Sequence, residues 1–261
     1  MILEVRNLKK SFKRPFSREK ICAVDDVSFS LKKGSTLGIV GESGSGKSTI
    51  AKLVMRLLPC DAGDIYFEGK EISRLKENGL TVFRKKTQMI FQDPFLSLDP
   101  KMKVRDILAE PTLVGGHANG ISLDAKIKEL LACVELDPRF LFRYPRELSG
   151  GECQRIAIAR AISMNPDFLV CDEPVSSLDL LVQAQVLNLL LKLQKDRSIS
   201  FLFISHDLRV VRHMSDEVLV LKKGQVCEMG PRDQIFQNPK EPYTKELVQN
   251  SLQMGSPRFI I

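Results

Sequence analysis

The order of apolar and polar residues along the chain predicts an α/β protein. From Leu3 to Arg6 the two kinds of residue alternate, as in a half-buried strand, and Val24–Leu31 has the same character. Leu37–Val40 is continuously apolar and enters a glycine-rich loop. Ser48–Leu58 then has the apolar spacing of a helix that Pro59 ends. This strand–loop–helix order is typical of the start of an α/β domain.

The middle of the chain has a different pattern. From about Asp93 to Asn165 it predicts helices and loops, including helices at Asp124–Val134 and Glu152–Met164. Phe168–Cys171 is then continuously apolar, as in a strand buried in a parallel sheet. We therefore expect a helical segment inserted between two halves of one α/β core. The remaining expected elements are a helix at Leu180–Leu193, a strand at Ile199–Ile204, and a hairpin of Glu217–Leu221 and Gln225–Met229.

The glycine-rich loop carries the strongest chemical signal. It fits the pattern G-x-x-x-x-G-K-[ST] with the residues Gly41, Glu42, Ser43, Gly44, Ser45, Gly46, Lys47 and Ser48. Glycines let successive backbone N–H groups face phosphate oxygens, and the positive end of the following helix, which includes Thr49, faces the same anion. Lys47 would supply charge to the β- and γ-phosphates, and the Ser48 hydroxyl would bind Mg²⁺. The loop predicts binding of a nucleoside triphosphate.

The apolar strand that begins at Phe168 ends in two carboxylates, Asp172 and Glu173. Ligands of open α/β sheets bind beyond the carboxyl ends of the strands, so both carboxylates are expected beside the phosphates. We expect Asp172 to hold Mg²⁺ through water, and Glu173 to orient or deprotonate the attacking water. The loop and this strand together leave kinases, GTPases, helicases and recombinases open.

Composition narrows the possible partners. The formal net charge is +7, but basic and acidic residues alternate along most of the chain, so nucleic acid is not expected as the partner. The six cysteines stand apart without a C-x-x-C pair, which is typical of reduced thiols rather than of a zinc site or disulfides. No apolar stretch approaches the roughly 20 residues of a membrane span. Any transport function would need a pore from other polypeptides.

A third motif decides among the enzyme classes. Leu148-Ser149-Gly150-Gly151-Glu152 precedes a helix-like stretch, and its Glu152 lies 20 residues before Asp172. This segment resembles the signature of the ABC transporter ATPases, with Glu152 where glutamine is commoner. The Ser149 hydroxyl and the N–H groups of Gly150 and Gly151 stand at a helix start, where they can receive a γ-phosphate.

Other features of the same family follow in order along the chain. Gln92 resembles the Q-loop glutamine, which contacts Mg²⁺ and water and joins the core to the helical insert. Ser177-Leu178-Asp179 resembles the D-loop, which would place Asp179 at the nucleotide. His206, just past a predicted core strand, resembles the switch histidine that contacts the γ-phosphate. Phe12 stands where the family has its adenine-stacking aromatic residue, and Phe16 is the alternative.

The resemblance runs from Leu3 to about Asn250. It implies a P-loop NTPase (RecA-like) core with a mainly parallel sheet, an N-terminal antiparallel β subdomain and an inserted α-helical subdomain. Residues 1–261 would form a single ABC ATPase domain. Within it we expect a nucleotide-binding core at 1–92 and 165–232, the helical insert at 93–164 and a C-terminal tail at 233–261.

The family mechanism follows from the same resemblance. The phosphate loop of one subunit would face the signature of another, so ATP and Mg²⁺ would lie within a dimer that opens when the γ-phosphate is lost. The resemblance also implies integral membrane permease subunits, an extracytoplasmic substrate-binding protein in the full complex, and peripheral attachment at the cytoplasmic face of the cell membrane.

Two segments resemble the peptide and nickel importer branch: Thr87–Pro100 and Ile235–Leu247. Many peptide-importer ATPases of this branch carry a longer, cysteine-bearing C-terminal extension, whereas no cysteine follows Cys227 here. That departure favours a short form like those of nickel or metal-chelate importers, with dipeptides still open. Because importers of this branch usually pair two different ATPases, we expect a heterodimer, with a homodimer as the alternative.

The sequence thus predicts an ATP-hydrolysing subunit of an importer for peptides or for nickel or metal chelates. A soluble ABC-type ATPase acting in DNA repair, chromosome structure or translation is the main alternative. Such proteins generally carry two cassettes, long coiled coils or zinc motifs, which this sequence lacks. A small-molecule kinase with a phosphate loop would leave the signature and His206 unexplained.

Overall fold

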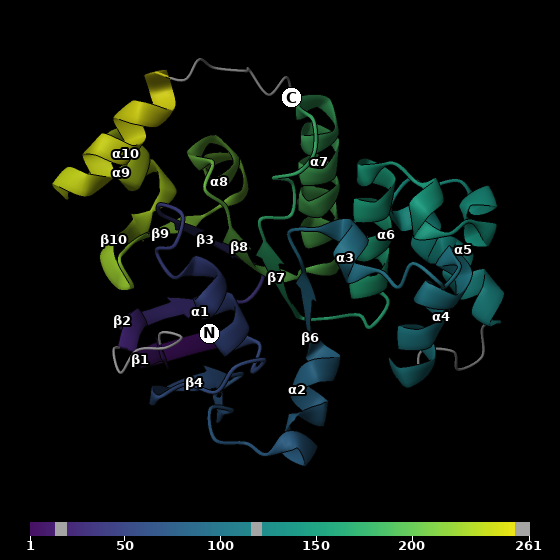
Figure 1. Cartoon of the computed structure of the whole chain (residues 1–261), viewed down its shortest axis with the longest axis horizontal. Helices are drawn as coiled ribbons and strands as arrows, with labels where there is room; N and C mark the ends of the chain where they lie inside the picture. Colours follow the sequence, from purple (N-terminus) through teal and green to yellow (C-terminus); the bar gives the residue numbers. More distant parts are fainter. Residues whose placement is uncertain (14–19, 116–121, 254–261) are drawn as a thin grey trace. The chain divides into compact units, whose positions relative to one another are not determined.

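The computed structural model describes residues 1–13, 20–115 and 122–253. Figure 1 shows the chain coloured along its sequence. The chain forms two compact units: the first contains residues 1–83 and 200–261, and the second contains residues 84–199. None of the helices in the described ranges combines the length and apolar character needed to cross a bilayer.

An antiparallel sheet forms the N-terminal part of the first unit, as predicted. Its order is β2-β1-β4-β5, and Leu3 of β1 pairs with Leu31 of β2 and with Phe67 of β4. All three of these apolar side chains are buried, which follows from the alternation of the β1 sequence. The strands are β1 (Leu3–Lys13), β2 (Lys20–Leu31), β4 (Ala62–Phe67) and β5 (Lys70–Glu71).

Four further strands of the first unit carry the glycine-rich loop. In their order, β10-β9-β3-β8, the central β3 runs parallel to both β8 and β9, and β10 closes a hairpin with β9. Every residue of β3 and β8 is buried, as expected for continuously apolar strands of a parallel sheet. The strands are β3 (Thr36–Val40), β8 (Ser200–Ile204), β9 (Glu217–Lys222) and β10 (Gln225–Pro231).

Helices of the first unit cover these strands. In Figure 1 the last two helices of the chain lie beside β10. The helices are α1 (Lys47–Val54), α8 (Leu208–Met214), α9 (Arg232–Gln237) and α10 (Pro242–Gln253); α2 (Thr81–Lys86), preceded by the 3₁₀ turn η1 (Glu77–Leu80), leads to the second unit.

The second unit is mainly helical around two parallel strands. Strand β6 pairs with β7, which is buried along its whole length. Figure 1 shows α6 among the helices α3, α4, α5 and α7, and its apolar residues, such as Ile156 and Ile158, are fully buried. The elements are β6 (Thr87–Ile90), α3 (Pro94–Ser97), α4 (Val104–Gly115), α5 (Leu123–Cys133), η2 (Pro138–Phe142), η3 (Pro145–Glu147), α6 (Gly150–Ile162), β7 (Phe168–Asp172) and α7 (Leu180–Arg197).

One predicted helix boundary is wrong. The helix expected to continue to Leu58 ends at Val54, because Arg56 adopts a left-handed conformation with φ of 55°. The Leu57 and Leu58 amides then donate to the Lys52 carbonyl, which closes the helix end. Pro59 therefore follows the stop and does not cause it.

Gly38 of β3 offers a test of the packing that holds this strand. A Cβ atom there would lie 2.2 Å from Ser215 Oγ and 2.5 Å from Val211 Cγ1, beside α8. Overpacking of this kind costs about 1–3 kcal/mol, so we expect Gly38→Ala to lower the thermal midpoint by several degrees. Gly230→Ala is the control, since its nearest neighbour is the end of the flexible Gln234 side chain at 3.3 Å. Equal midpoints for the two variants in differential scanning calorimetry would contradict this packing.

Candidate functional site

The predicted site residues fall into two sets, one in each compact unit. The phosphate loop, Phe12 and His206 belong to the first unit, and Gln92, Asp172, Glu173, the signature and Asp179 belong to the second.

The phosphate loop is held by close backbone contacts that only glycine permits. A Cβ atom on Gly41 would meet the Leu221 carbonyl oxygen at 2.1 Å, and one on Gly46 would meet the Ala23 carbonyl oxygen at 2.2 Å. Both residues also have positive φ values, 154° and 107°. Gly44, with φ of 78°, has nothing within 4 Å of its would-be Cβ, so the loop is packed on one side and open at Gly44. Such a loop is a backbone cradle of the kind that fits a polyphosphate.

Lys47 points back into its own loop. Its Nζ donates to the carbonyl oxygens of Gly41 and Glu42, each at 2.7 Å, and the residue is only 5% exposed. The ammonium group is thus fixed at the N-terminus of α1, where the helix end also favours an anion.

His206 and the phosphate loop lie at the same edge of the first unit's parallel strands. Ile39 of β3 is in register with Ile204 of β8, so Gly41 and His206 both follow the carboxyl ends of neighbouring strands. His206 is exposed, and Asp207 after it accepts a hydrogen bond from the Arg209 amide at the start of α8. Burial works to raise the pKa of Asp207, but its bonds with Arg209 outweigh burial and hold that pKa below its usual value.

The second unit brings Gln92 and Glu173 together. Strands β6 and β7 are parallel, with Ile90 in register with Cys171, so both residues emerge at one strand edge. Gln92 Nε2 donates to Glu173 Oε2 at 3.0 Å. Glu173 has a φ of 51°, which is uncommon for a residue with a side chain and is found preferentially at functional sites. Asp172, the last residue of β7, is 7% exposed.

The signature residues form the start of α6. Ser149 is the N-cap, and its Oγ accepts from the Glu152 amide at 3.3 Å. Glu152 Oε2 in turn accepts from the Ser149 backbone N–H at 2.7 Å and from its hydroxyl at 2.9 Å. This capping box orders the first turn of α6, from Gly150 onward.

The D-loop packs against the signature within the second unit. A Cβ atom on Gly151 would lie 2.5 Å from Val182 Cγ1, and one on Gly150 would lie 3.3 Å from Leu178. Asp179 caps α7, and its Oδ1 accepts from the Val182 amide at 3.0 Å. The starts of two helices, α6 and α7, therefore lie against each other here.

Phe12, the predicted adenine-stacking residue, lies in β1 opposite Ile21 of β2. Its ring is 39% exposed, with Lys10 Nζ 5.8 Å from the ring centroid. The alternative, Phe16, is outside the described residues. An exposed ring is available for stacking, but the assignment stays a prediction.

Comparison with known proteins identifies the family. A sequence model described as ABC transporter matches residues 24–176. The oligopeptide transport ATP-binding protein OppF of Streptococcus mutans is 46% identical over 95% of this chain and 80% of its own length. AppF of Bacillus subtilis, another oligopeptide transport ATP-binding protein, is 48% identical over 95% of this chain and 78% of its own length. The chain belongs to the ABC transporter family and is one of its ATPases.

A solved structure supports the fold. The dimeric post-hydrolysis structure of the ATP-binding cassette MJ0796 bound to ADP and Pi matches with a TM-score of 0.79 and 29% identity, over 88% of this chain and 98% of that one. The predicted fold class, a P-loop NTPase with a mainly parallel sheet, is thereby confirmed. The division into a core, an insert from residue 93 and a tail stays a prediction.

One side chain of this ABC ATPase was missed from the sequence. Arg160, in the last turn of α6, donates through Nη1 to the Ser97 carbonyl oxygen at the end of α3. It therefore ties the signature helix to the segment that follows Gln92. The only sequence signal is a charged residue within an otherwise apolar stretch of α6.

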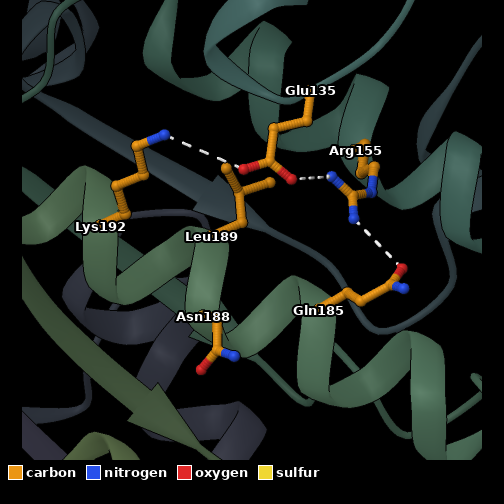
Figure 2. Close-up of a pocket in the computed structure, with 6 residues that line it drawn as sticks. All are labelled: Glu135, Arg155, Gln185, Asn188, Leu189 and Lys192. Atoms are coloured by element: carbon orange, nitrogen blue, oxygen red, sulfur yellow. Dashed lines mark hydrogen bonds and ion pairs between the residues drawn. The ribbon is translucent and has the colours of Figure 1, made fainter. Parts of the chain in front are cut away.

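The second unit also contains a polar groove of about 370 Å³, shown in Figure 2. Its charged side chains contact one another and nearby polar groups. Arg155 donates to Glu135 at 3.1 Å and to Gln185 at 3.3 Å, and Lys192 lies 3.9 Å from Glu135. Arg155 also donates to the Val134 carbonyl at 2.9 Å. These contacts link the segment after α5 to helices α6 and α7.

Two buried thiols of the second unit lie next to predicted site residues, Cys153 after Glu152 of the signature and Cys171 before Asp172. Burial raises the pKa of Cys153 to about 11, with Glu152 and Asp93 adding to the effect, and its Sγ lies 3.4 Å from the Pro145 carbonyl oxygen. Burial, with Asp172, also raises the pKa of Cys171. The thiolate is the reactive form of cysteine, so both thiols stay protonated and react slowly with electrophiles at neutral pH.

We therefore expect iodoacetamide at pH 8 to label exposed Cys22 well before Cys153 and Cys171. Mass spectrometry of tryptic peptides over a time course measures the order, and labelling in denaturant supplies the control in which all six thiols react. Labelling of Cys153 as fast as Cys22 in the folded chain would contradict the closed packing at the start of α6.

Proposed function

We propose that this ATPase powers an ABC importer of peptides. The observation that carries the proposal is the 44–48% identity, over 95% of the chain, to several proteins named oligopeptide transport ATP-binding proteins. The glutathione import ATP-binding protein GsiA of Escherichia coli, at 45% identity over 40% of its length, is named for a peptide as well. Nickel or metal-chelate import and action in DNA repair or translation have no such support here.

The residues of the first unit would bind the nucleotide. Loop amides between Gly41 and Ser48 would donate to the phosphates, and Lys47 would turn from its loop carbonyls to the β- and γ-phosphates. We assign His206 to the γ-phosphate and Phe12 to the adenine ring. Hydrogen bonds from Lys47 to phosphate oxygens would replace its two hydrogen bonds to the loop carbonyls.

The residues of the second unit would carry out hydrolysis. Glu173 would take a proton from the attacking water, and Gln92 would orient the Glu173 carboxylate through the bond they share. A Mg²⁺ bound with ATP would neutralise phosphate charge. The Ser48 hydroxyl, Gln92 and Asp172 suit it, because this ion takes only one or two protein carboxylates together with the phosphates and water. The described residues contain no group of three His, Cys, Asp or Glu placed to hold a metal by themselves.

The signature would act on a nucleotide held by another ATPase subunit. Ser149, Gly150 and Gly151 present a hydroxyl and N–H groups at the start of α6, and Asp179 stands close to them at the start of α7. The match to a dimeric cassette with bound ADP and Pi supports this arrangement. The second subunit would be a different ATPase or a second copy of this chain.

In the working complex, the dimer would sit at the cytoplasmic face of the cell membrane against integral permease subunits. An extracytoplasmic binding protein would deliver the peptide. Closure around ATP and opening after hydrolysis would then drive the permease, since the γ-phosphate binds one arrangement of the subunits better than the other.

Glu173→Gln tests the catalytic assignment. Removal of a general base lowers rates by about 10²–10⁴-fold, so we expect hydrolysis to fall by that factor while ATP still binds and closed dimers accumulate. Phosphate release and size-exclusion chromatography with ATP measure the two effects. Glu129→Gln, an exposed change of the same kind in α5, is the control. Turnover in Glu173→Gln equal to that control would remove Glu173 from the reaction.

Reconstitution tests the transport assignment. The chain is co-expressed with the permease, partner ATPase and binding-protein genes that neighbour its own gene, and the complex is placed in proteoliposomes. We expect ATP hydrolysis to rise when a peptide-loaded binding protein is added, and the same complex carrying Glu173→Gln to show no rise. Stimulation by a nickel chelate alone, or recovery of the chain with DNA or ribosomes in place of membrane subunits, would refute peptide import.

A further inference from the structure

The C-terminal helix of the first unit is anchored to β10 by a buried carboxylate. Glu228, 8% exposed, accepts the Lys240 amide at 2.9 Å and the Glu241 amide at 3.1 Å. Burial acts to raise the pKa of Glu228, but the two amides and the Thr244 side chain together outweigh burial and lower that pKa, so the group is negatively charged at neutral pH. Its charge lies just before α10, at the helix end that favours an anion. The start of α10 is therefore fixed in place.

The hydrogen bonds of Glu228 hold Tyr243, in the first turn of α10, beside the phosphate loop. Tyr243 is 7% exposed, and its hydroxyl oxygen accepts the Glu42 backbone N–H at 3.4 Å. Lys222 Nζ lies 4.3 Å from the centre of the Tyr243 ring, where a cation is attracted to the ring face. Lys222 ends β9, which pairs with β3 directly before the loop, with Val40 in register with Val220. The ring thus sits at the strand ends from which the loop departs.

Tyr243 and Lys47 form hydrogen bonds with opposite sides of the same peptide group. The Glu42 N–H and the Gly41 carbonyl belong to one planar unit. The N–H donates to Tyr243, and the carbonyl oxygen accepts from Lys47 at 2.7 Å. Hydrogen bonds at the two ends of one amide polarise each other. The phenol therefore helps to set the orientation of the peptide that positions the Lys47 ammonium.

The Tyr243 hydroxyl is suited to this role at neutral pH. Burial raises the pKa of Tyr243, and the Glu42 carboxylate acts in the same direction. The phenol stays protonated, so its oxygen can accept from the Glu42 amide while its proton remains available to the Glu42 carboxylate.

We propose that Tyr243 is a positioning residue for nucleotide binding, and that helix α10 is a structural part of the phosphate site. The proposal rests on the proposed role of Lys47 in binding phosphate. It assigns a function to the segment around Pro242 that the transport mechanism leaves without one. It also implies that nucleotide binding stabilises the docking of α10, since coupling between two sites is reciprocal.

Tyr243→Phe removes the hydroxyl and keeps the ring over which Lys222 lies. Loss of one hydrogen bond corresponds to a change of about two- to tenfold in an equilibrium constant. We expect the dissociation constant of a fluorescent ATP analogue, titrated into the purified chain, to rise by about that factor. The thermal midpoint without nucleotide should stay within about 3 °C of wild type. A structural role alone would shift the midpoint and leave the dissociation constant unchanged.

Tyr66→Phe is the matched control, because the Tyr66 ring also carries a cation, Arg6 at 4.7 Å, and lies in β4 of the other sheet. A dissociation constant for Tyr243→Phe equal to that of Tyr66→Phe would overturn the proposal. Hydrogen exchange on the wild-type chain supplies a second measurement that needs no variant. ATP should slow exchange of the α10 amides between residues 245 and 251, and unchanged exchange there would also overturn it.

These measurements use the isolated chain and its nucleotide alone. They do not depend on the cargo of the importer. A failure of peptide-stimulated hydrolysis in proteoliposomes would therefore refute the transport assignment, while equal affinities of Tyr243→Phe and Tyr66→Phe would refute only the role of Tyr243.

Discussion

The phosphate loop depends on a close approach of backbones that leaves no room for side chains at two positions. The Leu221 carbonyl fills the space beside Gly41, and the Ala23 carbonyl fills the space beside Gly46. One carbonyl comes from β9, far along the chain from the loop, and the other comes from β2, the strand that precedes β3. The loop conformation is therefore a consequence of how both sheets of the first unit pack, and Lys47 takes its place against loop carbonyls that this packing orients.

In the second unit, strand ends and helix starts deliver the chemical groups. The parallel pairing of β6 with β7 brings Gln92 to Glu173, and the left-handed conformation of Glu173 is held where a strand gives way to a turn. Ser149 and Asp179 are both N-caps, and the absence of a side chain on Gly151 lets their helices meet. Both arrangements follow from backbone direction: N–H groups point out of helix starts, and parallel strands end at a common edge.

The sequence predicted the elements whose signal is local. Continuous apolar runs located β3, β7 and β8. The end of an apolar run pointed to Glu173 and the family resemblance pointed to Gln92, and the structure brings these two side chains within 3.0 Å. It missed β4, because Gly63 and Asp64 interrupt the strand pattern, although Gly63 is needed where a Cβ atom would meet the Arg6 and Asn7 carbonyls. It also left α4 unassigned, because Pro111 lies inside that helix. The anchoring of α10 by Glu228 was out of reach for a different reason, since its partners are amides that no side-chain pattern reveals.

Glu152, which stands where glutamine is commoner in the family signature, changes the hydrogen bonding of Ser149. Its carboxylate accepts both the backbone N–H and the hydroxyl of Ser149, so the serine proton already has a charged acceptor. If Ser149 donates to a γ-phosphate, as proposed, its hydroxyl must exchange one anionic acceptor, the Glu152 carboxylate, for another, the phosphate. The backbone bond from Ser149 to Glu152 can persist meanwhile and keep the start of α6 in order. A glutamine at this position would offer the serine a neutral acceptor, and hydrogen bonds to charged acceptors are the stronger ones. The carboxylate therefore orders the signature more firmly than an amide would. Breaking the hydrogen bond from the Ser149 hydroxyl to Glu152 also costs more free energy than breaking the same bond to a glutamine would.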